Sequence, residues 1–453
     1  MKSASVNITF AAQQMRFDSS FHLSDGLEVR RMMKKSPYGL STVRDITKDI
    51  YCPGIFRRNY TKSGYAFLGG GDIQKADYDS GKYLKKIRTP NWEILEVKKG
   101  WTLVTCGGTI GDTVFTNSLL AKCWVSQHVM RVIPNDKIKE GMLYAYLATK
   151  FGKLLLTTGT YGSVIPTISS ENIAVLPIPN FPTTFQKEVD DLIQQSATLR
   201  EQATDKLAEA KRIFENEIGV SNTDYGTYKD EAIAIQSIAG KFKRMDSQYQ
   251  IGHKSIIKEK HNLTTTKISD VAKDIFTGNR GKRNYVENDG IYFLSSSEMM
   301  LANPKRFCKK ISHRTPNLND LLVKKGNILI SRSGTVGNTI LVSDDLNGCA
   351  VSEHAMRLVI DEEKIAPEYV FAYFCTKQGK DSLAILPYGS VIVTLGEEFL
   401  GDVDLPLLPI ETQKRITALV KEYSQMTDMA IEKENKAIIM VEEEIEKWQS
   451  PTA

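Results

Sequence analysis

Features that mark several specialised classes of protein are missing from this sequence. No run of about 18 apolar residues occurs, so neither a transmembrane helix nor a membrane partner is expected. The segment 1–20 has no long apolar stretch, so a secretory signal is not expected either. The six cysteines are widely scattered and form no CxxC pair, which favours reduced thiols in a cytoplasmic protein over a disulfide framework or a zinc site.

Motifs for nucleotide binding and DNA methylation are also missing. A Walker loop has the pattern GxxxxGK[ST], but the glycine-rich segments 103–116 and 329–342 have no lysine after their last glycine. Strand-like residues follow instead, so we expect both segments to form β-hairpins with glycines in the tight turns. Neither a [DN]PP[YF]-like loop nor a methyltransferase glycine loop occurs. We therefore predict no catalytic site and no metal site, with an unrecognised nuclease or methyltransferase as the alternative.

The sequence does contain an ordinary globular composition. Of its 453 residues, 41% are hydrophobic and 25% are charged, and the length predicts two or more domains. The net charge of +5 permits a polyanionic partner without requiring one, because a solvated surface of mixed charge would give the same value.

A long repeat organises the chain. The segments VKKGWTLV and VKKGNILI are 226 residues apart, as are SQHVMR and SEHAMR. RRNY and KRNY are 225 residues apart, and YGSVIPT and YGSVIVT are 227 apart. Because the order is unchanged, we infer a tandem duplication of a unit far longer than a solenoid repeat. We expect two similar lobes and pseudo-two-fold symmetry.

Each copy has a β-rich part followed by a long helical pattern. Short β-branched segments bounded by Gly, Asn or Asp predict the strands. The segments 183–218 and 411–448 contain no Gly or Pro, which favours one long helix in each. Thr183 with Gln186 fits a capping box at the start of the first helix.

Both helical segments carry a stripe with 4-3 spacing, and the two stripes match position for position at an offset of 227 residues. Such a stripe forms a seam that a partner helix can bury, and a lysine within it can fix the register. The alternative is that each helix packs on its own β-rich lobe. The seam residues are Val189, Leu192, Leu199, Lys206 and Ile213 in the first helix, and Ile416, Leu419, Met426, Lys433 and Met440 in the second.

Two histidines recur in the duplication. His128 and His354 occupy the same place in the pattern S-x-H-x-M-R, and no metal-ligand spacing occurs near either. A duplicated structural histidine is favoured over an acid–base group.

Taken in order, these doubled motifs resemble the specificity (S) subunit of type I restriction-modification enzymes. The matching segments are RSGTVGNT and GGTIGDT, YGSVIPTISSENIAVLPIPNFP and YGSVIVTLGEEFLGDVDLPLLP, and the helix starts FQKEV and TQKRI. The resemblance implies an α+β fold with two similar β-rich target-recognition domains, separated by two long antiparallel helices that form a coiled-coil spacer. It places these domains at 1–182 and 243–409, the spacer helices at 183–219 and 410–449, and a linker at 220–242.

The resemblance also implies a function in host defence. The chain would be a non-catalytic subunit that reads a split site on double-stranded DNA. It would direct two methylation subunits and, in the full complex, two restriction subunits. No cofactor is expected on this chain, because S-adenosylmethionine, ATP and Mg²⁺ belong to the partner subunits. Related two-part restriction systems use similar subunits, so the catalytic partner stays open. Docking surfaces would be flanked by Lys187, Arg200, Lys414 and Lys421, unless these helix faces are simply solvated.

Polar clusters supply the candidate DNA contacts. Cations position phosphates, and Arg and Asn side chains can read guanine and adenine edges. The shared RNY core is expected to contact the backbone or to be structural, whereas neighbours that differ, such as Phe56 and Gly281, suit sequence reading better. An ordinary solvated loop is the alternative. The candidates are Arg57, Arg58, Asn59, Tyr60 and Lys62 in the first copy, Asn279, Arg280, Lys282, Arg283, Asn284 and Tyr285 in the second, Arg332 and Ser333 in the second hairpin, and Tyr161, Ser163, Tyr388 and Ser390 in the YGS motifs.

Overall fold

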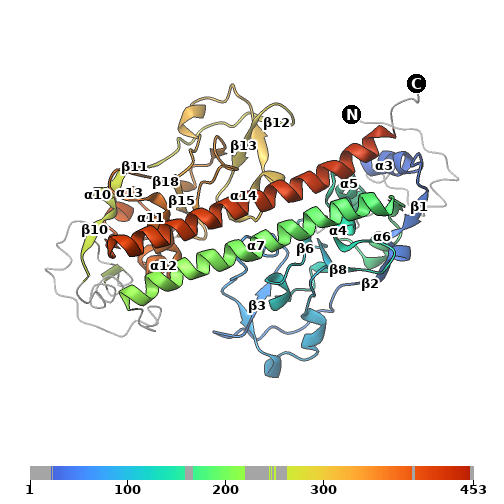
Figure 1. The fold of residues 1–453 in the computed structure, drawn as a ribbon, viewed down its shortest axis with the longest axis horizontal. Helices are drawn as coiled ribbons and strands as arrows, with labels where there is room; N and C mark the ends of the chain where they lie inside the picture. Colours follow the sequence, from blue (N-terminus) through green and yellow to red (C-terminus); the bar gives the residue numbers. More distant parts are fainter. Residues whose placement is uncertain are drawn as a thin grey trace. The chain divides into compact units, whose positions relative to one another are not determined.

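The structure is a computed structural model, and it describes residues 22, 24–158, 167–219, 244, 246, 249–250, 263–389 and 393–448. It divides into two units: unit 1 is Met1–Glu201 with Met429–Ala453, and unit 2 is Gln202–Asp428. Each unit therefore contains one β-rich domain and part of both long helices (Figure 1). The linker expected at 220–242 lies outside the described residues.

Unit 1 is built on a four-stranded antiparallel sheet with the strand order β2-β8-β5-β6. A smaller sheet has the order β4-β3-β7, in which β3 and β7 run parallel, and β1 pairs with β9. The strands are β1 (Leu40–Thr42), β2 (Thr47–Tyr51), β3 (Tyr65–Leu68), β4 (Tyr83–Leu84), β5 (Thr102–Thr105), β6 (Thr113–Phe115), β7 (Trp124–Val125), β8 (Val129–Pro134) and β9 (Pro177–Pro179). The helices of its domain are α3 (Asp25–Met33), α4 (Glu140–Ala148), α5 (Lys150–Thr158) and α6 (Ser170–Ala174).

Unit 2 repeats this plan with a four-stranded sheet in the order β11-β18-β15-β16. A second sheet has the order β12-β14-β13-β17, and β10 pairs with β19. The strands are β10 (Thr265–Lys267), β11 (Ala272–Thr277), β12 (Tyr285–Val286), β13 (Ile291–Leu294), β14 (Lys309–Ile311), β15 (Ile328–Ser331), β16 (Thr339–Leu341), β17 (Ala350–Val351), β18 (Ala355–Ile360) and β19 (Asp404–Pro406). Its helices are α10 (Ile268–Val271), α11 (Pro367–Cys375), α12 (Lys377–Ala384) and α13 (Glu397–Gly401).

The duplication predicted from the sequence is confirmed by the sheets, although the smaller sheet of unit 2 has an additional strand, β12. Both four-stranded sheets have a register shift at the same point, between Thr47 and Asp49 in β2 and between Ala272 and Asp274 in β11. In each smaller sheet one pair is parallel, β3 with β7 and β13 with β17. The fold is therefore mixed α+β with two similar β-rich domains and two long helices.

The glycine-rich segments form the predicted hairpins. Strand β5 pairs with β6, and β15 pairs with β16, both antiparallel. Gly111 has a φ of 82° and its equivalent Gly337 a φ of 92°, a left-handed conformation that costs other residues free energy. These glycines therefore serve tight turns between strands, and the hairpins do not precede helices as a phosphate-binding loop would.

A buried arginine lies at the centre of each domain. The Arg131 guanidinium donates to the carbonyl oxygens of Ser126, Val129, Val125 and Leu95 at 2.5–3.3 Å. The equivalent Arg357 donates to the carbonyl oxygens of Leu321 and Val351, both at 2.9 Å. Both side chains are fully buried, and burial lowers the pKa of each to about 10. These arginines fasten the ends of several strands and loops to one point in each domain.

The long helices are α7 (Thr183–Ile218) and α14 (Ile410–Lys447). In unit 1 the Ser196 hydroxyl donates to the Ala430 carbonyl at 2.7 Å, so the helices touch directly. In unit 2 Lys206 pairs with Glu422 at 2.6 Å, and Arg415 donates to Glu209 at 3.0 Å. Because residue numbers rise on α7 as they fall on α14, the helices are antiparallel. None of the helices in the described ranges has both the length and the apolar character of a membrane span.

The helices bury a face wider than the seam drawn from the 4-3 spacing. Val189 and Ile416 are fully buried, Leu419 is buried, and the remaining seam residues are half-buried. Ile193, Phe214 and Val441, which lie off the seam, are also fully buried. They pack into the hydrophobic cores of the two units together with residues of the β-rich domains. Each helix therefore contacts both the other helix and its neighbouring domain.

Candidate nucleic-acid interface

The first polar cluster lies in the loop between β2 and β3. Its members Arg57, Arg58, Asn59, Tyr60 and Lys62 are all exposed. The Arg58 guanidinium lies 5.5 Å from the centre of the Phe67 ring and donates to Gln127 Oε1 at 2.9 Å. The aromatic ring on β3 therefore orients the loop through Arg58. Asn59 Nδ2 donates to the Arg88 carbonyl at 3.4 Å, and the Tyr60 ring lies 6.2 Å from Phe67.

The second cluster contains the same contact between an arginine and a phenylalanine, but the polar partner of its arginine is an acid instead of an amide. Arg283 lies 5.5 Å from the centre of the Phe293 ring, as Arg58 does from Phe67. Its partner is the carboxylate of Glu353 at 3.3 Å, where unit 1 has the neutral Gln127. The Arg283 side chain is only 9% exposed. Its contacts are those of a residue that positions the loop.

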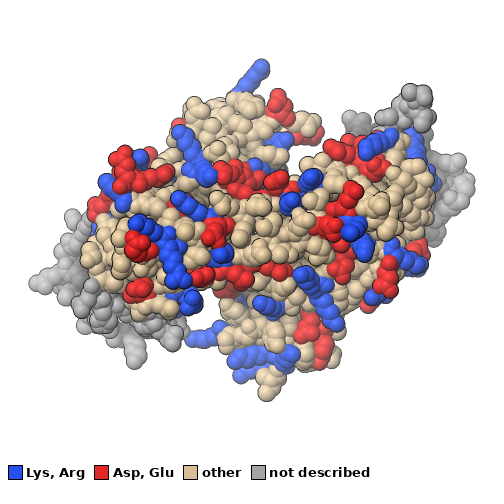
Figure 2. Space-filling model, viewed as in Figure 1, with Lys and Arg blue, Asp and Glu red and all other residues tan. Residues whose placement is uncertain are grey.

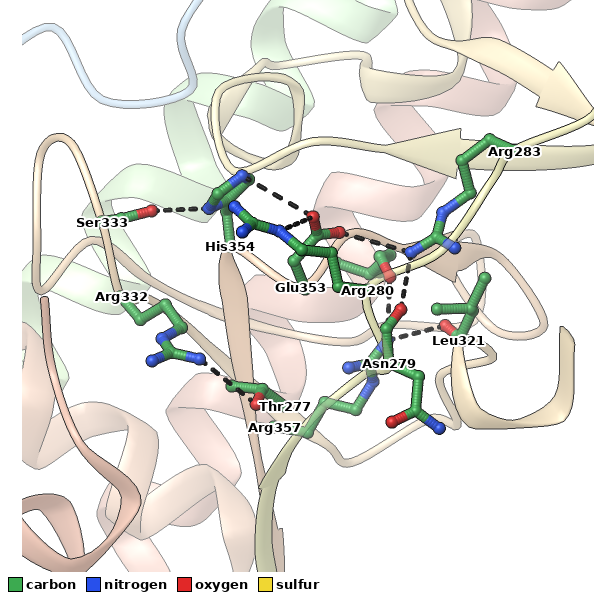
Figure 3. A network of polar contacts seen from close by, with 11 residues as sticks. Thr277, Asn279, Arg280, Arg283, Leu321, Arg332, Ser333, Glu353, His354 and Arg357 are labelled. Atoms are coloured by element: carbon green, nitrogen blue, oxygen red, sulfur yellow. Dashed lines mark hydrogen bonds and ion pairs between the residues drawn. The ribbon is translucent and has the colours of Figure 1, made fainter. Parts of the chain in front are cut away.

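Glu353 is the centre of a polar network in unit 2 (Figure 3). Its carboxylate lies 3.5 Å from Arg280 Nε and 3.9 Å from His354 Nε2, besides its contact with Arg283. Burial acts to raise the pKa of this carboxyl group, but a backbone hydrogen bond and the charges of His354 and Arg283 outweigh burial and lower it. Asn279 faces another acid, because its Nδ2 donates to Asp320 Oδ2 at 2.7 Å. The Arg280 side chain remains 83% exposed.

The two hairpins differ where the sequence suggested a site. Arg332 Nη1 donates to Thr277 Oγ1 at 3.3 Å, and Ser333 Oγ shares a 2.7 Å hydrogen bond with His354 Nδ1. At the equivalent positions of unit 1 the sulfurs of Cys106 and Cys52 are 3.1 Å apart. A Cβ atom added to Gly107, the equivalent of Ser333, would lie only 2.9 Å from His128 Nδ1. The histidine position is therefore kept in both hairpins while its neighbours change.

The structure brings some of the remaining candidates together. Tyr388 is 44% exposed, and its backbone pairs with Thr394, which also bridges to Ser333. Arg332 and Ser333 are half-buried. The exposed members of the second cluster are Asn279, Arg280, Lys282, Asn284 and Tyr285. Tyr161, Ser163 and Ser390 lie outside the described residues.

A groove beside the first cluster is absent from the sequence-based prediction. It has a volume of about 540 Å³ and lies between the loop 54–59 and the segment 86–95. Lining residues include Ile55, Arg57, Lys86, Ile87 and Arg88. Two segments about thirty residues apart form it, so a scan for local motifs could not find it. Its only sequence signal is the pair of isolated isoleucines within basic, polar stretches.

The described residues show no metal-binding group at either cluster. Among them, no three His, Cys, Asp or Glu side chains are grouped as ligands for a metal ion. The chemistry at both clusters is that of hydrogen-bond donors, cations and exposed apolar side chains, which suits the reading of a polyanion.

Comparison with known proteins gives two matches to one family model, described as the type I restriction modification DNA specificity domain, at residues 58–209 and 260–439. Among solved structures, the type I restriction-modification S subunit from M. genitalium is 12% identical, with a TM-score of 0.35, and the alignment covers 92% of this chain and 97% of that chain. The HsdS subunit from Thermoanaerobacter tengcongensis is also 12% identical, with a TM-score of 0.29 and coverage of 92% and 98%.

Proposed function

Because the chain belongs to the type I restriction modification DNA specificity domain family and carries two copies of that domain, we propose that each copy reads one half of a split DNA site. The chain is the DNA specificity subunit of such a system, and the family assigns it to the non-catalytic part of the complex. The residues proposed to face DNA are the exposed members of the two loop clusters, one in each unit.

One observation carries this proposal. The same arginine-on-phenylalanine contact holds the same loop in both domains, at 5.5 Å in each, while the residues that precede the shared RNY core have diverged. A fixed frame with variable exposed side chains is the arrangement expected of two readers with different sequence preferences. Phosphate contacts from Arg57, Lys62 and Lys282 would position the duplex, and their polar neighbours would contact base edges.

The partners follow from the same proposal. Two methylation subunits, and two restriction subunits in the full complex, would bind S-adenosylmethionine, ATP and Mg²⁺, and this chain would bring them to the site in the cytoplasm. Acidic and basic side chains alternate along the exposed faces of α7 and α14, which supports docking of polar partner surfaces there (Figure 2). Arg200, expected on the docking surface, is instead turned inward. Its side chain is 20% exposed and pairs with Glu434 at 2.7 Å.

The purified chain tests the proposal directly. Alone, it should bind DNA but leave it unmodified in the presence of S-adenosylmethionine, ATP and Mg²⁺. Together with its methylation subunits, it should methylate two separated half-sites, which can be mapped on genomic DNA. Modification of DNA by the chain alone, or one continuous recognition sequence, would contradict the proposal.

A further inference from the structure

Two isoleucines in unit 1 are almost fully exposed. In the part of the chain that the structure describes, Ile55 is 92% exposed and Ile87 is 91% exposed. The next most exposed large apolar side chain there is Ile410 at 61%. A fully exposed isoleucine forgoes the free energy that burial would give, so two of them on one surface indicate a contact made with another molecule.

Both isoleucines line the groove described above, and the charge of that groove points to its ligand. Arg57, Lys86 and Arg88 also line it, and no acidic residue does. An apolar surface rimmed by cations alone is complementary to DNA, whose phosphates would meet the cations while its base edges meet the apolar tips.

The groove wall is held in place by aromatic stacking. The ammonium group of Lys86 lies 3.5 Å from the centre of the Trp92 ring. Trp92 stacks on Trp124 with centroids 5.8 Å apart, and Trp124 stacks on Tyr65 at 4.5 Å. Because Lys86 precedes Ile87 directly, this contact fixes the turn from which Ile87 projects.

The second domain keeps the backbone turn of this wall but not its aromatic stack, because Trp92 and Trp124 correspond to Leu318 and Ala350. Asn91 and its equivalent Asn317 both have positive φ angles, 52° and 53°, and both follow the sequence Arg-Thr-Pro. The buried Thr89 and Thr315 are likewise equivalent. At the offsets set by the flanking repeats, Ile55 corresponds to Arg280 and Ile87 to His313. The exposed side chains are therefore apolar in unit 1 and polar in unit 2, while the left-handed turn and the buried threonine beside them are kept.

We propose that Ile55 and Ile87 read the first half-site through the C5-methyl groups of thymines in the major groove. The inference rests on the proposed function, because it requires that unit 1 contacts DNA. Thymine is the one DNA base with an apolar group on its major-groove edge, so apolar side chains can select it without a hydrogen bond. In the second domain Arg280 and His313 offer hydrogen-bond donors at the equivalent positions, so we expect that domain to select other bases.

The test uses the full chain bound to its methylation subunits. Methylated positions in genomic DNA first define the two half-sites, and affinity is then measured on duplexes in which each thymine of the first half-site is replaced by deoxyuridine. Loss of a contacted methyl group should weaken wild-type binding about fourfold. The double variant Ile55→Ala, Ile87→Ala should lose affinity for the thymine duplex and be indifferent to deoxyuridine. Its affinity for the second half-site and its salt dependence should be unchanged, because no charge is removed.

The control is Val175→Ala, which shortens another exposed apolar side chain of unit 1 and should change nothing. A first half-site without thymine, or wild-type binding that is indifferent to deoxyuridine, would overturn the inference. So would a double variant that loses its methylation subunits, since the isoleucines would then be a protein contact. If the wild-type complex shows no sequence preference at all, the proposed function itself fails. If it shows one that the double variant retains, only the inference fails.

Discussion

Arg131 and Arg357 occupy the same place in the two domains but satisfy their hydrogen-bonding groups unequally. Arg131 donates to four carbonyl oxygens and leaves only its Nε without a partner. Arg357 donates to two and leaves both Nε and Nη1 without partners. Replacing a buried arginine removes the cost of burying its charge but leaves its carbonyl partners unpaired. The free-energy cost of losing the arginine should therefore be larger at Arg131, which has more carbonyl partners, than at Arg357.

We expect Arg131→Met to destabilise unit 1 by about 2–4 kcal/mol, and Arg357→Met to destabilise unit 2 by less. Tryptophan fluorescence follows unit 1 selectively, since all four tryptophans lie in it, whereas circular dichroism follows both units. Lys48→Met, at an exposed position, is the control. An Arg357→Met variant that is the less stable of the two would refute the argument. The tryptophans are Trp92, Trp101, Trp124 and Trp448.

Glu353 is expected to make the free energy of unfolding of unit 2 fall at low pH. Its pKa in the folded chain lies below the ordinary value of 4.5, so its ionised form stabilises the fold at neutral pH. That contribution is lost as the pH falls below 4.5 through the folded pKa. Glu353→Gln gives unit 2 the residue that unit 1 has at Gln127, and it should flatten the loss of stability in acid. Unfolding followed by circular dichroism at several pH values checks this, and an unchanged acid dependence would contradict it.

At the scale of elements, the two long helices are joined by a buried ion pair in unit 1. Arg200 on α7 lies 2.7 Å from Glu434 on α14, and the Glu434 side chain is 7% exposed. The Tyr144 hydroxyl of α4 also donates to Glu434. Helix pairing and domain packing are therefore connected through one carboxylate.

Glu434→Ala is expected to destabilise unit 1 by about 3–5 kcal/mol, because Arg200 would be left as a buried charge without its carboxylate. The double variant Arg200→Met, Glu434→Leu should recover much of this loss, since apolar residues can replace a buried pair. Glu209→Gln breaks the more exposed pair with Arg415 and should cost less than about 1 kcal/mol. Denaturant titrations distinguish the three variants. Equal effects of the Glu434 and Glu209 changes would show that burial does not decide the outcome.

Elements were easier to predict from the sequence than contacts. The hairpin turns at Gly111 and Gly337 followed from local rules, because glycine alone adopts their φ angles cheaply. The inward orientation of Arg200 did not follow, because a charged residue is buried only when a distant residue supplies its partner. The groove at Ile55 and Ile87 was missed for the same reason. Sequence periodicity describes one segment at a time, whereas the ion pair of Arg200 and the groove each require two segments that are distant in the sequence.

At the scale of the molecule, duplication predicts independent readers. Replacing residues 270–404 by the equivalent segment of a relative should change one half-site and leave the other as it was, because these residues lie wholly within unit 2. Mapping of methylated positions before and after the exchange measures this. A change in both half-sites would show that the readers are coupled. The exchange of residues 40–179 in unit 1, from β1 to β9, is the reciprocal experiment.

The near-complete exposure of Ile55 and Ile87 also bears on evolvability. Substitutions at such positions remove little packing, so they leave the chain above the stability threshold that purges most mutations in a core. A change of target can therefore arise from substitutions at these two positions without loss of the fold. The stacked rings behind Ile87 bear the structural constraint, and the tips in front of them are open to drift and selection.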